Sequence, residues 1–211
     1  MRRTASVPAR INIIGEHTDR FGGMALSFPS QHRLVLSASR SRSGAIGDPV
    51  VVRLWESAGG WDAELKVQSE IPIGAGMSSS AALCVAVAMC SGNFDGEMDV
   101  SLEAQRIEHE VLDSHCGLLD QIAITHSTKG YATLIDFDCM SVSDFRVPSD
   151  WLFKLVDTGI RRNLRETDYN SSEVCKETRV MHTLLESERV REALHCDVNR
   201  LGKLLNQSHA S

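Results

Sequence analysis

A glycine- and serine-rich stretch at residues 71–83, Ile-Pro-Ile-Gly-Ala-Gly-Met-Ser-Ser-Ser-Ala-Ala-Leu, has the residue types of an anion-binding loop. Gly74 and Gly76 let the backbone approach a ligand closely, and the serines supply hydroxyl groups and free N–H donors. An apolar run at residues 81–90 follows at once, and the N-terminus of such a helix attracts phosphate. The spacing is neither that of a Walker loop nor that of a dinucleotide-binding loop, because the required lysine and third glycine are missing. The stretch predicts a phosphate-binding loop, with an ordinary N-cap before a core helix as the alternative.

A second group of polar residues interrupts a short apolar segment near the N-terminus. Residues 15–19 read Gly-Glu-His-Thr-Asp, so Glu16, His17 and Asp19 lie within four positions. Such a cluster either hydrogen-bonds a ligand or forms a polar turn. Two further carboxylates, Glu108 and Asp120, would by themselves be ordinary surface residues, because acidic side chains are seldom buried.

The composition excludes several classes of function. The chain has 211 residues, a formal net charge of −6 and only 5% aromatic residues, and no basic cluster is interleaved with aromatics, so we expect no nucleic-acid partner. The longest apolar run is too short to span a bilayer and the N-terminus lacks a hydrophobic signal region, so we expect no membrane association and a cytoplasmic protein. The six cysteines are scattered without a Cys-x-x-Cys pair, which is unlike a zinc knuckle or a disulfide framework. Four histidines match no standard metal-site spacing: His17, His109, His115 and His126.

The elements that must position these residues follow from the hydrophobic pattern. We expect strands at residues 7–14, 34–37, 50–55, 64–69, 131–137 and 153–156. Helices are expected at residues 81–90, at 101–112 with Ser101 as the N-cap, at 118–126 and from 173 to the end. The last helical region has a charged face that we expect to be solvated, formed by Glu186, Glu188, Arg189, Arg191 and Glu192. Separated runs of strands and helices indicate an α+β fold.

Several motifs then resemble one family. Residues 10–19, Arg-Ile-Asn-Ile-Ile-Gly-Glu-His-Thr-Asp, together with Gly22 and Gly23, closely resemble the signature of galactokinases in the GHMP small-molecule kinase superfamily. The stretch at 71–83 resembles the second motif of that superfamily. Residues 116–121, Cys-Gly-Leu-Leu-Asp-Gln, and 130–136, Gly-Tyr-Ala-Thr-Leu-Ile-Asp, resemble the galactokinase segment with the catalytic aspartate and the strand after it. The similarity continues through residues 156–164, 168–170 and 206–211, and such motifs in the same order are highly specific.

The resemblance implies a two-domain GHMP kinase fold with the active site between the domains. The first domain, residues 1–167, would have a mixed sheet packed on helices and would carry the sugar and ATP-phosphate motifs. Residues 168–211 would begin the C-terminal domain. That domain would be incomplete, because the third glycine-rich motif of the family has no counterpart before Ser211.

The resemblance also implies ATP-dependent phosphorylation of a sugar at its anomeric hydroxyl. Asp120 would lie beside that hydroxyl, and Arg10 would lie beside Asp120 and the transferring phosphate. Phosphoryl transfer needs positioning and charge neutralisation more than covalent work. Asp120 would either accept the hydroxyl proton or orient the hydroxyl while Arg10 stabilises the γ-phosphate, and the sequence leaves both roles open.

The binding residues implied by the resemblance fall into three groups. The sugar would contact Glu16, His17, Asp19, the backbone of Gly117, and Tyr169. ATP would contact Gly74, Ala75, Gly76, Met77, Ser78, Ser79, Ser80 and, near the adenine, Trp61. Mg²⁺ would be held by Ser80 or Ser79 together with Glu108, which suits a cation that needs few protein oxygens besides phosphate and water.

One departure from the family pattern leaves the sugar open. Arg20 stands where galactokinases usually carry a tyrosine, and a cation there would bind a carboxylate. Galactose is our first choice, with galacturonate or N-acetylgalactosamine as alternatives. A non-catalytic sugar and ATP sensor with the same fold is a further alternative, and intact Ser80, Ala81, Arg10 and Asp120 favour the enzyme. The expected partners are a sugar and ATP, in a monomer or weak oligomer.

Overall fold

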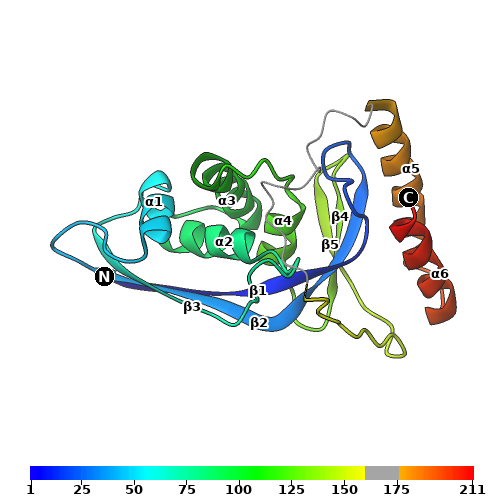
Figure 1. Ribbon diagram of the computed structural model, residues 1–211, viewed down its shortest axis with the longest axis horizontal. Coiled ribbons are helices and arrows are strands. Elements are labelled where there is room, and N and C mark those ends of the chain that lie inside the picture. The colour runs from blue at the N-terminus through cyan, green and yellow to red at the C-terminus, as the bar shows by residue number, and fades with distance from the viewer. Residues whose placement is uncertain (160–175) are drawn as a thin grey trace. The chain divides into compact units, whose positions relative to one another are not determined.

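The computed structural model describes residues 1–159 and 176–211 as an α+β structure (Figure 1). This confirms the expected fold class. Its strands are β1 Arg2–Ile14, β2 Met24–Arg40, β3 Ala63–Ser69, β4 Ala132–Asp136 and β5 Ser141–Phe145. Its helices are α1 Pro49–Ser57, α2 Ser79–Ser91, α3 Glu97–Leu112, α4 Leu119–Thr125, α5 Lys176–Ala193 and α6 Val198–His209.

The strands form one five-stranded sheet in the order β1-β2-β4-β5, and β3 also pairs with β2. The long strand β2 makes this branching possible. Its beginning runs antiparallel to β4, with Met24 opposite Asp136, while its end runs antiparallel to β3, with Leu34 opposite Ser69. The β4–β5 pair is also antiparallel, and a single parallel bridge joins Ile46 and Glu64.

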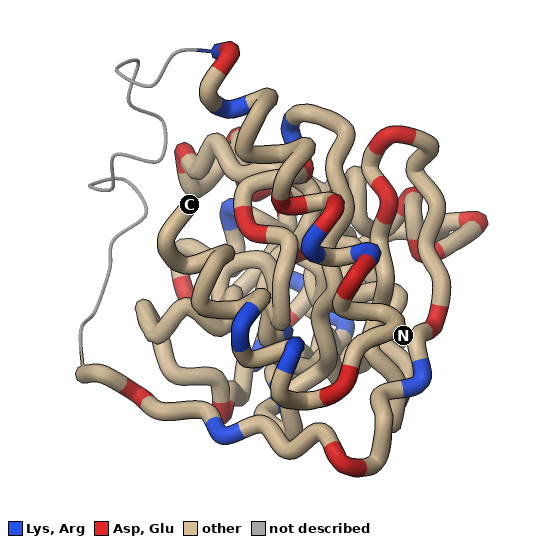
Figure 2. The backbone as a smooth tube through the Cα atoms, turned by 90° about the vertical axis from the view of Figure 1, so that its right-hand side faces the viewer, with Lys and Arg blue, Asp and Glu red and all other residues tan. Residues whose placement is uncertain are grey.

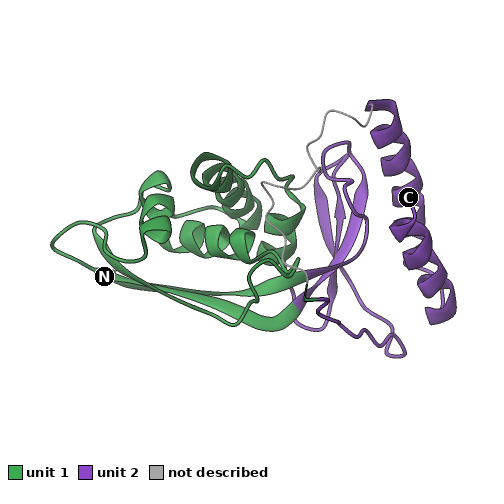
Figure 3. Ribbon diagram, in the orientation of Figure 1, with its two compact units in different colours: residues 1–10, 30–125, 159–167 green, residues 11–29, 126–158, 168–211 purple. Residues whose placement is uncertain are grey.

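The chain divides into two compact units (Figure 3). Unit 1 comprises residues 1–10, 30–125 and 159–167, and unit 2 comprises residues 11–29, 126–158 and 168–211. Both β1 and β2 contribute residues to each unit. The predicted domain boundary at residues 167 and 168 lies outside the described residues and stays a prediction.

In unit 1, four helices cover one side of the strands (Figures 1 and 3). Helix α2 packs against α1, α3 and α4, and nine of its 13 residues are buried. This explains why its sequence is largely apolar rather than amphipathic. A helix packed in this way is a rigid support for the loop that precedes it.

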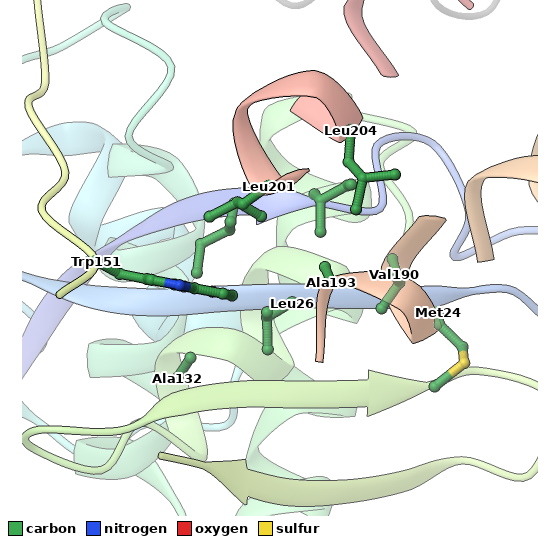
Figure 4. Packing of buried hydrophobic residues seen from close by; sticks show 10 residues of the cluster. Met24, Leu26, Ala132, Trp151, Val190, Ala193, Leu201 and Leu204 are labelled. Atoms are coloured by element: carbon green, nitrogen blue, oxygen red, sulfur yellow. The ribbon is translucent and has the colours of Figure 1, made fainter. Parts of the chain in front are cut away.

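In unit 2, helices α5 and α6 pack against each other, and apolar side chains from both helices join the sheet in one core cluster (Figure 4). Leu26 from β2 and Ala132 from β4 meet Val190 of α5 and Leu204 of α6 in this cluster. The ring of Trp151 belongs to the same core and lies 6.1 Å from that of Phe145. The C-terminal helices are therefore part of the hydrophobic core of unit 2.

Three sequence expectations were wrong. Residues 50–55 form part of helix α1, because Asp48 caps the N–H groups of Val50 and Val51, Pro49 opens the first turn, and three apolar side chains are buried on one face. Residues 153–156 have no regular secondary structure and are exposed to solvent. Helix α3 begins four residues before Ser101, whose hydroxyl instead donates to the carbonyl oxygen of Glu97.

Acidic and basic residues are interspersed along the chain rather than segregated (Figure 2). Among the residues that the structure describes, none of the helices has the length and apolarity needed to cross a bilayer.

Candidate active site

The segment between β3 and α2, residues 70–78, forms what we call the glycine loop, and it lies in unit 1. Gly74 and Gly76 both have left-handed backbones, with φ of 71° and 73°. A Cβ atom on Gly76 would meet open space, so this glycine is required by the backbone turn and not by packing. Met77 is buried and anchors the end of the loop in the core. The loop thus combines a tight backbone with an open outer side.

Ser78 occupies the N-cap position of α2 with an unusual left-handed backbone, φ 58°. Its hydroxyl does not cap the helix but donates to Oδ2 of Asp120, 2.5 Å away. The first N–H groups of α2 are therefore left for another acceptor, and Ser79 and Ser80 beside them are partly exposed. An uncapped N-terminus of a long helix is suited to bind a phosphate.

Arg10 and Asp120 form a partly buried ion pair next to this loop. Arg10 lies on β1 and Asp120 in the first turn of α4, and their side chains are 17% and 28% exposed. The Arg10 Nε donates to Asp120 Oδ1 at 2.8 Å, and a second guanidinium nitrogen lies 2.5 Å from the same oxygen. The Nη1 of Arg10 also donates to the carbonyl oxygen of Gly76 at 3.0 Å. The pair is thereby fastened to the glycine loop from both partners.

Glu108, on α3, is a second carboxylate in the same unit and is only 1% exposed. It accepts hydrogen bonds from the Ser80 hydroxyl and from Nε2 of Gln121, the latter at 2.7 Å. Burial raises the pKa of Glu108 to about 7, and the negative charge of Asp120 adds to the rise, although these hydrogen bonds oppose it. A nearby cation would stabilise the charged form of a carboxylate that is buried in this way.

The donors around Glu108 fit a divalent cation of the magnesium kind. A carboxylate and a serine hydroxyl are hard oxygen ligands, and such ions take their other ligands from phosphate and water. Over residues 1–159 and 176–211, the structure has no group of three or more His, Cys, Asp or Glu side chains suited to hold a metal.

Unit 2 holds the other predicted cluster, on what we call the polar loop, residues 15–23. Thr18 is fully buried, and its hydroxyl lies 3.0 Å from the carbonyl oxygens of both Gly15 and Met24. The carbonyl oxygen of Thr18 accepts from the N–H groups of Phe21 and Gly23. Thr18 thus closes the loop internally, which explains its place in the cluster without a ligand. Glu16 and His17 are exposed and Asp19 is partly exposed, as ligand-binding side chains need to be.

The His17 side chain is held in a strained part of the polar loop, with φ 61°. Although the residue is solvent-accessible, its ring lies among neighbouring atoms, and this desolvation lowers the pKa of His17. Glu16 and Asp19 oppose the shift with their negative charges. The neutral imidazole is therefore favoured, and it can both donate and accept a hydrogen bond.

Three further predicted site residues lie outside both loops: Gly117, Trp61 and Tyr169. Gly117 is partly exposed in the segment between α3 and α4. Trp61 follows α1, and its ring lies 5.5 Å from that of Trp55, whose Nε1 donates to the Trp61 carbonyl oxygen. Tyr169 lies outside the described residues. The structure brings Arg10, Asp120, Glu108 and the glycine loop together in unit 1, and Glu16, His17 and Asp19 together in unit 2.

The sequence prediction for Glu186, which lies behind the polar loop, was wrong. Glu186, expected on a solvated face of the last helical region, is fully buried and accepts a hydrogen bond from the N–H of Gly15. The buried positions of α5 recur every three or four residues: Thr183, Glu186, Ser187, Val190 and Ala193. That spacing was present in the sequence and would have placed Glu186 on the inner face.

Comparisons with known proteins show which sequences this chain resembles. Residues 2–40 match the family model described as the galactokinase galactose-binding signature, and residues 43–128 match that of the GHMP kinases N terminal domain. The galactokinase of Thermotoga maritima is 30% identical over 266 aligned positions, which cover 97% of this chain and 75% of that protein. The galactokinase of Chloroflexus aurantiacus is 30% identical over 243 positions, which cover 96% of this chain and 62% of that protein.

Solved structures share the fold. The structure of Lactococcus lactis galactokinase complexed with galactose has a TM-score of 0.78 and 20% identity, with 99% of this chain and 74% of that chain covered. The mevalonate kinase of Methanococcus jannaschii has a TM-score of 0.65 and 13% identity, with 100% of this chain and 78% of that chain covered. From the sequence relatives and the fold together, the chain belongs to the galactokinase family of the GHMP kinases.

Proposed function

We propose that this protein is a galactokinase, which transfers the γ-phosphoryl group of ATP to the anomeric hydroxyl of galactose and gives galactose 1-phosphate and ADP. The observation that carries the proposal is the Arg10–Asp120 pair, which is hydrogen-bonded to the glycine loop through Gly76 and Ser78. This pair sits in a chain whose relatives at 30% identity are galactokinases.

In the proposed reaction, the anomeric oxygen forms a bond to the γ-phosphorus while the bond from that phosphorus to the bridging oxygen breaks. The hydroxyl proton leaves the sugar, and ADP takes up the electron pair of the broken bond. Asp120 either accepts that proton or orients the hydroxyl for attack. Arg10 would stabilise the phosphoryl oxygens in the transition state with its charge, and its ion pair with Asp120 would hold the carboxylate in place.

The nucleotide phosphates are assigned to the glycine loop and to the N-terminus of α2. The backbone of Gly74, Ala75, Gly76 and Met77 would surround the phosphates, and Ser78, Ser79 and Ser80 would contribute N–H groups and hydroxyls. Trp61 is kept as the adenine contact on the resemblance alone. Mg²⁺ is proposed as the divalent cation, held by Glu108 with Ser80 or Ser79, where it would neutralise negative charge between the phosphate oxygens.

Sugar binding is assigned to Glu16, His17 and Asp19, with the Gly117 backbone and Tyr169 as further contacts. Directional polar groups are what a site needs to distinguish sugars that differ at one hydroxyl. The exposed placement of Glu16 and His17 and the neutral imidazole of His17 support this assignment. Because the reaction consumes ATP, we also propose a cytoplasmic enzyme, acting as a monomer or weak oligomer.

The proposal is tested by measuring ADP release from Mg-ATP with galactose, galacturonate and N-acetylgalactosamine in turn. We expect turnover with galactose that disappears in Asp120→Asn. Preference for galacturonate would instead assign Arg20 to a substrate carboxylate, and an Arg20→Gln variant should then lose that preference. Measurable sugar and nucleotide binding without ADP release would contradict the enzyme and favour a sensor.

A further inference from the structure

Helix α5 of unit 2 makes two polar contacts to the backbone of the polar loop and a third to Met24, the residue that follows it. We propose that Glu186 is a positioning residue for sugar binding, which fixes the polar loop from behind by accepting the Gly15 N–H. The proposal rests on the proposed function, because that function assigns Glu16, His17 and Asp19 on this loop to the sugar. Glu186 itself is fully buried and is not placed to touch a ligand.

Three donors converge on the Glu186 carboxylate. Its Oε1 accepts from the Gly15 N–H at 2.9 Å and from the Ser208 hydroxyl of α6 at 2.5 Å. Its Oε2 accepts from Nη1 of Arg189, one helical turn further along α5. Burial alone would raise the pKa of Glu186, but these hydrogen bonds and the Arg189 charge together lower it. The carboxylate is therefore charged at neutral pH, and its bond to Gly15 is a charge-assisted one.

Two more contacts hold the loop along its length. The Met24 N–H, just after the loop, donates to the Ser187 hydroxyl at 3.1 Å, and the Ser187 hydroxyl in turn donates to the Thr183 carbonyl oxygen. The His182 Nε2 lies 2.9 Å from the carbonyl oxygen of Glu16. The loop is thus held by its backbone at its start, near its middle and just beyond its end.

Packing allows the loop little freedom against the helix. A Cβ atom on Gly23 would come within 2.6 Å of both Thr18 and the Thr183 methyl group. Within the loop, Thr18 joins the Gly15 and Met24 carbonyl oxygens. Since α5 fixes the backbone, the exposed side chains of Glu16 and His17 are carried by a loop that can shift little. Loss of the Glu186 anchor should therefore weaken sugar binding without altering the glycine loop, which belongs to unit 1.

The test is Glu186→Gln, which keeps the shape of the side chain but removes its charge. We expect the KM for galactose to rise about tenfold or more, because a hydrogen bond to a charged acceptor is weakened, while the KM for ATP stays unchanged. Hydrogen–deuterium exchange in the peptide covering residues 15–24 should become faster. The matched control is Glu192→Gln on the same helix, which breaks an exposed ion pair with Arg200 of α6 and makes no contact with the polar loop. This control should change neither quantity.

If Glu186→Gln does not fold, Ser208→Ala replaces it, because this variant removes one donor to the carboxylate and leaves the charge and Arg189 in place. We expect a smaller rise in the KM for galactose and a smaller increase in the exchange rate of residues 15–24, with the KM for ATP again unchanged. An unchanged galactose KM with unchanged exchange at residues 15–24, or an equal rise in both KM values, would overturn the proposal. Absence of galactose turnover in the wild-type protein would refute the proposed function instead, and the exchange measurement would then decide alone whether Glu186 fixes the loop.

Discussion

At the scale of single residues, the two acidic side chains of unit 1 have opposite surroundings. Asp120 is partly exposed and paired with Arg10, whereas Glu108 is buried without a cationic hydrogen-bond partner among the described residues, and burial raises its pKa. Two carboxylates in such different environments are suited to different chemical roles. In the proposed function, Asp120 with its partner Arg10 would act on the sugar hydroxyl, and Glu108 would hold a cation.

Replacing Arg10 by lysine tests the geometry of the pair rather than its charge. Lysine keeps one positive charge but has a single nitrogen in place of the three guanidinium nitrogens that reach Asp120 and the Gly76 carbonyl oxygen separately. We expect kcat to fall by about 10²- to 10³-fold. Arg33→Lys is the control, because Arg33 also makes two hydrogen bonds to one partner, Ser6, on the surface. A full rate in Arg10→Lys would show that the charge alone suffices.

The raised pKa of Glu108 predicts a stability that depends on pH. Its pKa is about 7 in the folded protein against the usual 4.5, so the stability that it contributes is complete below the lower value and is lost as the pH rises through the higher one. The difference corresponds to about 3 kcal/mol. Glu108→Gln, which has no charge to bury, should therefore be more stable than wild type at about pH 8 and equal to it at about pH 4.

Urea denaturation of both proteins in chelator at the two pH values measures this difference. With Mg²⁺ and a non-hydrolysable ATP analogue present, the advantage of the glutamine should shrink, because a bound cation favours the charged carboxylate. An equal stability difference at both pH values would contradict the burial of a titrating Glu108.

At the scale of elements, both loops depend on what lies directly behind them. The glycine loop rests on the buried helix α2, and the polar loop rests on β2 and α5. Gly15 shows how tight the second arrangement is: its φ is 99°, and a Cβ atom there would lie 2.4 Å from both the Cα of Ala25 and the Met24 carbonyl oxygen. Backbone atoms of a central strand cannot move aside.

Gly15→Ala should therefore destabilise the protein by about 2–4 kcal/mol through a steric clash added to backbone strain. Gly44→Ala is the matched control, because Gly44 has a similar φ of 83° but nothing within 4 Å of an added Cβ. This control should cost only about 1 kcal/mol from the backbone strain. Thermal unfolding of the two variants measures the difference, and equal losses would mean that residues 15 and 25 are not in close contact.

The sequence predicts a helix or strand correctly where residues close to it in the chain determine its conformation. Helix α2 was predicted because its apolar run is long and directly follows glycine and serine residues. Helix α1 was missed because three consecutive valines favour a strand, and only the Asp48 cap and the spacing of Val51, Leu54 and Trp55 reverse that preference. The burial of Glu186 could have been inferred from the helical spacing of α5, but its hydrogen bonds to Gly15 and Ser208 could not, because these partners lie 171 and 22 positions away in the sequence.

At the scale of the whole molecule, the predicted phosphate residues lie in unit 1, whereas Glu16, His17 and Asp19 lie in unit 2. Arg10 and Ile11 are the last and first residues of the two units along β1. The family could be predicted from the sequence because its motifs are contiguous and ordered. The contacts between motifs could not, because Arg10 and Asp120 are 110 positions apart and only the fold brings them together.

This division predicts separable binding of the two ligands. Galactose and a non-hydrolysable ATP analogue should each raise the thermal midpoint of unfolding. At a hundredfold excess of ligand over its Kd, the added free energy of unfolding is about 2.7 kcal/mol. Asp19→Ala should abolish the galactose effect and keep the nucleotide effect, and Ser80→Ala should do the reverse. Differential scanning calorimetry measures both shifts, and loss of both shifts in either variant would contradict the assignment of the residues.

Phosphoryl transfer to the anomeric oxygen is tested by identifying the product of the reaction by ³¹P NMR after incubation with Mg-ATP and galactose. We expect a sugar phosphate whose phosphorus couples to the anomeric proton, formed by the wild-type protein and missing with Asp120→Asn. A phosphate on another hydroxyl, or undiminished product with Asp120→Asn, would contradict the assignment of Arg10, Asp120 and the glycine loop to phosphoryl transfer at the anomeric oxygen.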